Sequence, residues 1–132
     1  MPLAIFYSQE LSEYDFGPGH PFRGDRYLIF PQFLKDNLPE DNYYRILESE
    51  PVTDEDLLLI CSREYIDFTR GFYRAANLGL NIDGQFFNFQ SGDNRPIGKP
   101  GKLEEAARMV IGQSKKACDL IQEVTYEKVV SI

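Results

Sequence analysis

The chain has 132 residues, of which 42% are hydrophobic and 14% aromatic, and its formal net charge is −7. This length corresponds to a single domain, residues 1–132, that buries enough surface to fold without a disulfide or a metal. The acidic balance argues against binding to nucleic acid or to an anionic membrane, and the ten Phe and eight Tyr argue against disorder.

The N-terminal part of the sequence predicts a strand, a loop and a helix. The apolar run Leu3–Tyr7 is typical of a short buried strand. Residues 8–24 predict a loop, because two glycines and two prolines lie within five consecutive residues. We then expect a helix from Asp25, whose side chain can cap it, to about Asn37, with Pro31 inside the pattern.

The middle of the sequence predicts a second strand followed by two helices. Tyr43–Leu47 has some of the alternation of a strand. The sequence T-D-E-D that begins at Thr53 resembles a capping box, and a short helix is expected over Leu57–Ile60. Ser62 can cap a further helix, in which the apolar residues have helical spacing and Gly71 is a weak point.

The last part of the sequence predicts a long loop, a long helix and a final strand. Asn77–Gly101 contains five glycines and no clear period, so we expect a long loop in which the aromatic cluster Phe86–Phe89 packs. Lys102 to about Glu123 is the clearest helix, and Tyr126–Ile132 is typical of a strand. The apolar stripe expected along that helix comprises Leu103, Ala106, Ala107, Val110, Ile111, Ser114, Ala117, Cys118, Ile121 and Val124.

The order of these elements predicts the fold class. Strands that alternate with helices pair in parallel, so the sequence predicts an α/β protein with a small, mostly parallel sheet. No apolar run approaches the roughly 18 residues of a membrane span. The N-terminus does not resemble a secretion signal, and we therefore expect a cytoplasmic protein without a membrane partner.

The few cysteine and histidine residues limit the metal chemistry that we expect. The chain has one histidine, His20, and two cysteines, Cys61 and Cys118. This set does not form a four-ligand zinc site, so no metal-binding residue and no cofactor are predicted for this chain. Both thiols are expected to be buried, because a free cysteine behaves as a small hydrophobic residue.

Three segments and a final strand follow one another in a recognisable order. The first segment is Y-D-F-G-P-G-H-P-F-R at Tyr14–Arg23, followed by Arg26. The second is C-S-R-E-Y-I at Cys61–Ile66, the third is G-D-N-R-P-I at Gly92–Ile97, and the strand is Glu127–Ile132. They resemble, in turn, four features of the histone deacetylase and acetoin utilization protein family. These features are its Y-x-x-G-x-G-H-P signature, its H-S-x-E-Y-I segment, its D-N-P or D-C-P loop, and the strand before its G-G-L-H-H-A motif.

The resemblance implies a fold, a reaction and a limit on this chain. The implied fold is a three-layer αβα unit, the first part of the deacetylase domain, with its three strands in the order 2-1-3. The family removes acetyl groups from acetyl-lysine-like amides with a zinc-activated water. The family's zinc ligands, paired histidines and oxyanion tyrosine follow the G-G-L-H-H-A motif. This chain therefore has no catalytic residue and is expected to be inactive by itself, and zinc is expected only in a complete family member.

The same resemblance singles out five residues as site candidates. Asp93 is a candidate for the rim, where the family's aspartate binds the substrate backbone; the alternative is an Asx turn. Tyr7, Gly19, His20 and Arg26 are candidates for lining the cavity beneath the metal. An arginine there can hold acetate, and the alternatives are an exposed helix arginine and, for the tyrosine, core packing. For His20 the favoured interpretation is a loop histidine bonded to a backbone carbonyl.

Two functions are consistent with these observations. The chain is either the N-terminal portion of a deacetylase-like zinc amidohydrolase or a stand-alone interaction or dimerisation module derived from that fold. In both cases the third strand has an uncovered edge, and the expected partner there is a second copy or a C-terminal deacetylase half. A nucleotide-binding domain ranks last, because no G-x-G-x-x-G motif follows a strand and no G-x-x-x-x-G-K-[ST] motif occurs.

Overall fold

Helices and short strands alternate along the chain, as the sequence predicts. The computed structural model describes residues 1–80 and 84–132. In chain order, with 3₁₀ helices marked η, the elements are β1 (Leu3–Phe6), η1 (Gln9–Glu13), α1 (Arg26–Asn37), β2 (Tyr44–Leu47), α2 (Asp54–Leu57), α3 (Arg63–Asn77), α4 (Phe86–Phe89), η2 (Gly92–Asn94), α5 (Leu103–Gln122) and β3 (Val129–Ser131).

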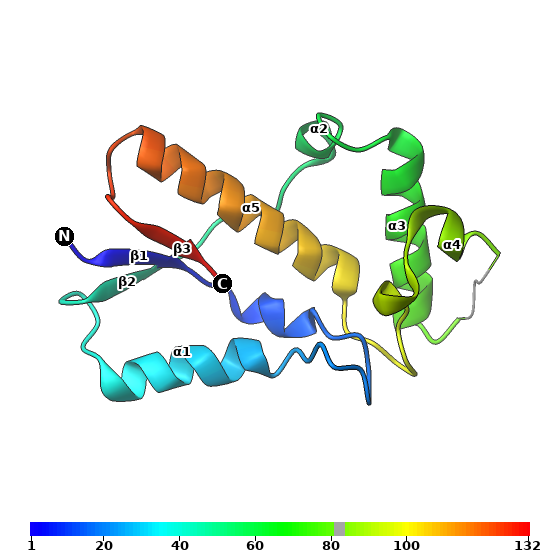
Figure 1. Ribbon diagram of the computed structural model, residues 1–132, viewed down its shortest axis with the longest axis horizontal. Helices are drawn as coiled ribbons and strands as arrows, with labels where there is room; N and C mark the ends of the chain where they lie inside the picture. Colours follow the sequence, from blue (N-terminus) through cyan, green and yellow to red (C-terminus); the bar gives the residue numbers. More distant parts are fainter. Residues whose placement is uncertain (81–83) are drawn as a thin grey trace.

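The three strands form one parallel sheet in the order β2-β1-β3 (Figure 1). In the central strand β1, Ile5 lies opposite Ile46 of β2 and Val130 of β3. The pairing is parallel because the chain between successive strands returns through at least one helix. The mixed α/β class, the parallel pairing and the strand order 2-1-3 are therefore confirmed.

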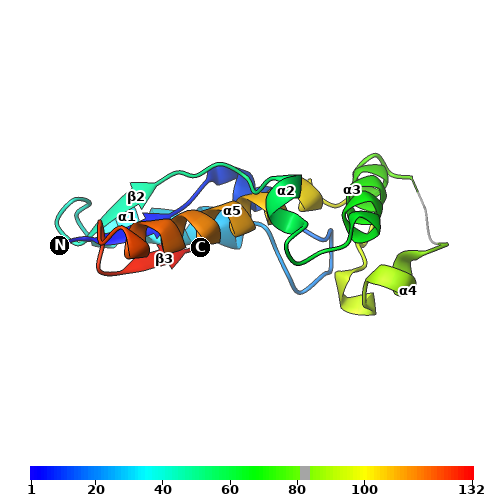
Figure 2. The ribbon, with the colours of Figure 1, turned by 90° about the horizontal axis from the view of Figure 1, so that it is seen from above.

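Helices cover both faces of this sheet. α5 lies along one face and α1 along the other, so the sheet lies between them (Figure 1). Seen from above, β2 and β3 emerge on either side of α5 (Figure 2). α3 and α4 lie beyond the sheet, near the start of α5, and make the molecule elongated. Among the described residues, no helix combines the length and the apolar character that crossing a membrane requires.

Three groups of buried side chains hold these layers together. The group between α1 and the sheet comprises Ile5, Leu34 and Tyr44. A second group joins η1, α1 and α5 and comprises Leu11, Tyr27 and Met109. The third group fills the space between α3, α4 and the start of α5, and its members are Phe16, Phe72, Tyr73, Phe86 and Leu103. The aromatic residues thus form a separate core for the part of the molecule that lies beyond the sheet.

Two of the three predicted helix caps are confirmed. Thr53 Oγ1 accepts a hydrogen bond from the N–H three residues later at 3.2 Å, and Ser62 Oγ accepts the equivalent bond at 3.1 Å. The side-chain cap predicted at Asp25 is wrong. This residue has helical backbone angles, whereas a capping side chain needs an extended backbone to reach the first N–H groups. Its carboxylate pairs with the guanidinium of Arg23 instead.

Two predicted segments are wrong in extent. The helix expected over Leu57–Ile60 is instead α2, which ends at Leu57, because the capping sequence starts the helix three residues before the apolar run. The segment 77–101 is not one long loop, since it contains α4 and η2. Its residues 81–83 lie outside the described part of the chain. Phe86 of α4 is 0% exposed, so the aromatic cluster does pack. These helices are too short, and too close to glycines, to show a helical period in the sequence.

Smaller corrections concern the first loop and the last strand. Residues 8–24 contain η1, which begins after Ser8, whose Oγ accepts a hydrogen bond from the Glu10 N–H at 3.3 Å. The last strand covers Val129–Ser131 rather than Tyr126–Ile132, because only these three residues form the paired register with β1. Both differences arise from local hydrogen bonding that the hydrophobic pattern does not encode.

The buried face of α5 is rotated relative to the predicted apolar stripe. Its buried residues are Leu103, Glu104, Ala106, Met109, Gly112 and Gln113. Several stripe members are exposed instead, namely Ile111, Ser114, Cys118 and Ile121 on the helix and Val124 after it. The cause is Gly112, where a Cβ would come within 3.0 Å of the Glu50 carbonyl carbon, so glycine lets α5 approach the segment after β2. The prediction of two buried thiols is wrong, since Cys118 is exposed and Cys61 is half-buried.

Candidate functional site

The loop that contains Gly19 and His20, residues 15–24, is closed by Asp15. We call it the histidine loop. One carboxylate oxygen of Asp15 accepts a hydrogen bond from the Gly17 N–H at 2.8 Å, and the other accepts one from the Gly24 N–H at 3.1 Å. Both ends of the loop are therefore held by one side chain. Asp15 is not among the site residues expected from the sequence, although an aspartate two residues before a glycine is the signal for such a turn.

Glycines allow the histidine loop to pack against the segment that follows η2. Gly17 has a φ of 103°, and a Cβ there would come within 2.8 Å of the Ile97 carbonyl carbon. The Ile97 N–H donates to the Phe16 carbonyl at 2.7 Å, so the two backbones are in contact. Gly19 has a φ of 85° with open space at its Cβ position, so its backbone conformation rather than a close contact favours glycine.

Both ring nitrogens of His20 are hydrogen-bonded, one within the histidine loop and the other to η2. Nδ1 accepts a hydrogen bond from the Phe22 N–H at 3.0 Å, so in the neutral ring the proton is on Nε2. Nε2 then donates to the Asp93 carbonyl at 2.8 Å, and the ring stacks on Phe16 with centroids 4.6 Å apart. The prediction of a loop histidine bonded to a backbone carbonyl is confirmed. A place for His20 beneath a metal stays a prediction.

Asp93 lies in η2 with an exposed side chain. The backbone carbonyl of its neighbour Asn94 accepts a hydrogen bond from the Tyr73 hydroxyl at 2.9 Å. Burial raises the pKa of Tyr73, which keeps this phenol protonated and able to donate. η2 is therefore fixed from two sides, by His20 and by Tyr73, while the Asp93 side chain faces solvent. The proposed contact of Asp93 with a substrate backbone stays a prediction.

Tyr7 and Arg26 have different surroundings from each other. Tyr7 directly follows β1, is half-buried, and donates its N–H to the Leu47 carbonyl at 3.1 Å. Burial raises the pKa of its phenol, as expected for a tyrosine that packs on the core. Arg26 is exposed at the start of α1, with its guanidinium carbon 3.7 Å from the centre of the Phe22 ring. That Tyr7 and Arg26 line one cavity beneath a metal stays a prediction.

Polar side chains are buried at the carboxyl ends of the strands, where open α/β sheets bind ligands. Gln113 of α5 is 0% exposed, and its Oε1 accepts a hydrogen bond from the hydroxyl of Ser131, the last residue of β3, at 3.4 Å. Within residues 1–80 and 84–132, neither Gln113 Nε2 nor the buried Ser49 hydroxyl has a hydrogen-bond partner. We call Ser49, Gln113 and Ser131 the strand-end site. It offers hydrogen-bonding groups that the described chain leaves unused.

A charged groove of ≈ 490 Å³ adjoins Ser49. Its charged lining residues are Glu48, Glu50, Asp56, Lys115, Lys116 and Asp119. Lys115 Nζ lies 3.0 Å from both carboxylate oxygens of Asp56, and this pairing lowers the pKa of the aspartate and raises that of the lysine. These two groups neutralise each other, which leaves three carboxylates and one ammonium in the lining, so the groove is net negative.

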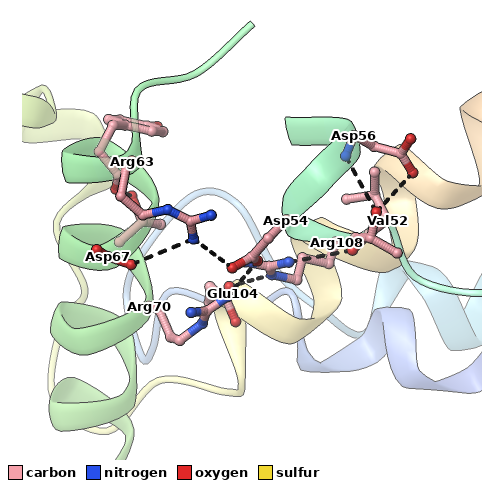
Figure 3. A network of polar contacts seen from close by, with 11 residues as sticks. Val52, Asp54, Asp56, Arg63, Asp67, Arg70, Glu104 and Arg108 are labelled. Atoms are coloured by element: carbon pink, nitrogen blue, oxygen red, sulfur yellow. Dashed lines mark hydrogen bonds and ion pairs between the residues drawn. The ribbon is translucent and has the colours of Figure 1, made fainter. Parts of the chain in front are cut away.

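A network of ion pairs ties α2, α3 and α5 together (Figure 3). Asp54, at the start of α2, accepts hydrogen bonds from Arg63 of α3 at 2.8 Å and from Arg108 of α5 at 2.7 Å. It also pairs with Arg70 of α3. Arg108 pairs in turn with the buried Glu104, one helical turn earlier on α5. The network therefore fixes α3, which lies beyond the sheet, to the helix that covers the sheet.

The arginines also determine the ionisation of Asp54. Hydrogen bonds from Arg70, Arg108 and Arg63 hold the pKa of its carboxyl well below the ordinary value. A carboxylate held ionised in this way is a poor general base, so the network is structural. From the sequence, Asp54 is expected only as part of a helix start. The available signal was the spacing of Arg63 and Arg70, which places both on one helical face.

The comparisons with known proteins add no assignment to these sites. No model of a known protein family matches the chain, and no curated protein sequence matches it. Over residues 1–80 and 84–132, the structure contains no group of three or more His, Cys, Asp or Glu side chains that could hold a metal ion. The function of the chain must therefore be inferred from its fold, the histidine loop and the strand-end site.

Proposed function

We propose that this chain forms the N-terminal portion of a histone deacetylase-like zinc amidohydrolase and is inactive by itself. The observation that carries this proposal is the parallel sheet in the order β2-β1-β3, which is also the strand order that the sequence resemblance implies. The contact between the histidine loop and η2 supports it further. This contact joins two of the segments on which the resemblance depends, through the His20 ring and the Asp93 carbonyl.

The outer edge of β3 supports a role as part of a larger sheet. In the described part of the chain β3 pairs only with β1, so its other side presents unpaired N–H and C=O groups. Val130, in the middle of β3, is 42% exposed. A further parallel strand would satisfy these groups, and a covering helix would bury the valine.

The strand-end site supports the same proposal. Gln113 Nε2 and the Ser49 hydroxyl are buried without partners among the described residues. Each buried polar group that lacks a hydrogen bond costs about 1–3 kcal/mol of folding free energy. A loop from a further strand beside β3, ending at the same carboxyl edge of the sheet, would supply the missing partner of Gln113 and remove this cost.

Catalysis belongs to the remaining portion of the proposed enzyme. In a complete family member, zinc activates the water that attacks the acetyl amide. The described residues of this chain do not fit a zinc site, so no hydrolytic step is derived from them. What this chain contributes is three strands of the sheet, together with a histidine loop and an η2 segment held in fixed positions.

Reading the coding DNA beyond the codon of Ile132 tests this proposal. We expect a reading frame, continuous or adjacent, that encodes a G-G-x-H-H segment. The purified chain with zinc and an acetyl-lysine peptide should show no metal-dependent turnover, whereas the two portions produced together should hydrolyse the peptide. Turnover by this chain alone, or a genome that lacks such a frame, would overturn the proposal.

The edge of β3 also favours a second candidate function, that of a stand-alone interaction module. In that case β3 pairs directly with a strand of a partner chain. Val130→Lys places a charge on this edge and should weaken the association by removing its edge contribution, which size-exclusion chromatography with light scattering measures. An association that persists unchanged in the variant rules this candidate out.

A further inference from the structure

α1 presents an apolar face to solvent. Its inward side comprises Tyr27, Pro31 and Leu34. On the opposite side Ile29 is 63% exposed and Phe33 is 59% exposed, and Phe30 is exposed beside them. Single exposed apolar residues are ordinary on protein surfaces, but three large ones together on the outer side of one helix are typical of a contact surface. The outer face of α1 therefore has the composition of a contact surface.

A shallow groove accompanies the N-terminal half of this face. It has a volume of ≈ 510 Å³, and its apolar lining residues are Pro21, Ile29, Phe30 and Phe33. The charged residues Arg23, Asp25 and Arg26 also line it. Apolar walls of this kind accept an aromatic side chain better than a polar one, because burial of the ring removes apolar area from water on both sides of the contact.

The two ends of α1 carry opposite charge. At the N-terminal end Arg23 pairs with Asp25, and beyond the C-terminal end Arg45 pairs with Asp41. Outside these pairs, the charged residues are Arg26 at the first end and Lys35, Asp36 and Glu40 at the second. The first end is therefore net positive and the second net negative, with the apolar face between them.

We propose that the outer face of α1 binds a second copy of the chain. The two α1 helices pack antiparallel about a twofold axis that crosses each helix at the level of Pro31, on the side opposite to its buried ring. Arg26 precedes Pro31 by five residues and Asp36 follows it by five, each about 7.5 Å along the helix. Antiparallel packing brings the positive end of each helix to the negative end of the other. Phe33 of each copy then lies over the groove beside Ile29 of the other, because these residues are spaced equally about Pro31. A twofold interface of this kind uses the same patch on both copies.

Charge favours a second copy over the other possible occupants. Parallel helices would place like charges together at both ends, whereas the antiparallel pair matches both ends at once. The net charge of −7 opposes attachment of the face to an anionic membrane. The contact does not use the edge of β3, so this inference is independent of the proposed function and of its alternative.

Sedimentation equilibrium of the full chain across the micromolar range tests the interface. Two short helices bury a small area, so we expect a dissociation constant of micromolar order. Phe33→Glu should raise it at least about tenfold, because the new charge would enter an apolar groove. Ile29→Glu should do the same by an independent change. Ile60→Glu replaces an apolar residue that is 83% exposed outside this face, and as the matched control it should leave the constant unchanged.

Charge reversals test the antiparallel arrangement. Arg26→Glu and Asp36→Arg should each raise the dissociation constant about threefold, and the double variant should return it to near the parent value. The double variant is the decisive measurement, because a general loss of stability would not be reversed by a second substitution. A chain that stays monomeric throughout, a constant that neither apolar variant changes, or a double variant weaker than both single variants would each overturn the proposal.

Discussion

Two helical glycines provide a paired test of how closely α5 packs on the segment after β2. A Cβ at Gly112 of α5 would come within 3.0 Å of the Glu50 carbonyl carbon and closer still to its oxygen. At Gly71 of α3, no described atom beyond its chain neighbours and the adjacent turns of its own helix backbone lies within 4 Å of the same position. We predict that replacement of glycine by alanine changes the stability of the protein in opposite directions at these two sites.

The magnitudes follow from two opposing contributions. Alanine is more favourable than glycine inside a helix by about 0.8–1 kcal/mol, so Gly71→Ala should raise the free energy of unfolding by about that amount. At Gly112 the same gain is opposed by overpacking, which costs about 1–3 kcal/mol. The obstacle is main chain, which cannot rotate away as a side chain can, so the upper part of that range applies. Gly112→Ala should therefore lower the free energy of unfolding by about 1–2 kcal/mol.

Urea unfolding followed by far-ultraviolet circular dichroism measures both effects. The midpoint should rise for Gly71→Ala and fall for Gly112→Ala, while the slope of the free energy with urea stays the same for both. A Gly112→Ala variant as stable as Gly71→Ala would refute the close approach of α5 to Glu50. It would also refute the reason given for the rotated buried face of that helix.

Three further predictions concern the histidine loop, the aromatic core and the ion-pair network. His20→Ala removes two hydrogen bonds and a stacked ring and should cost about 1–2 kcal/mol in the same assay; an unchanged midpoint would contradict the link to η2. Phe86→Ala should cost about 3–5 kcal/mol, whereas Phe87→Ala, at a side chain 66% exposed, should stay within about 0.5 kcal/mol, and similar effects would be inconsistent with the described core. For Asp54 the folded-state pKa is lowered, so its contribution to stability is present above the unfolded pKa of about 3.9 and is lost as the pH falls toward the folded value. Asp54→Asn should be less stable than the parent at pH 7 and should lose less stability on acidification, and equal pH profiles for the two proteins would disprove this role of the carboxylate.

The strands and the caps could be predicted because their causes are local. Each strand of the sheet lies within a segment that the sequence predicts as a strand, and the helices between these segments require parallel pairing. Thr53 and Ser62 cap helices because a short hydroxyl side chain reaches an N–H group three residues away. The equivalent cap predicted at Asp25 is wrong, because the carboxylate of this residue pairs with the nearby guanidinium of Arg23 and not with the first N–H groups of α1.

The contacts that shape the candidate sites could not be predicted, because they join residues far apart in the sequence. His20 was identified as a loop histidine, but its partner, the Asp93 carbonyl, is a main-chain group that no residue pattern reveals. The rotation of α5 depends on Gly112 and Gln113, a glycine and a polar residue that an apolar stripe leaves out. Asp54 forms ion pairs with arginines of α3 and α5, and the residue spacing within one helix does not show contacts with other helices.

The central strand β1 is made first, and its two neighbours follow far apart in the sequence, which orders the events of synthesis. Residues 3–6 can pair with 44–47 soon after both leave the ribosome, but their pairing with 129–131 must wait for α5 to be made. At about 5–20 residues per second, this wait is on the order of ten seconds. During that time one side of the strand is open to other nascent polypeptides. Chaperones that act during translation would therefore protect this chain most in the interval before its last strand emerges.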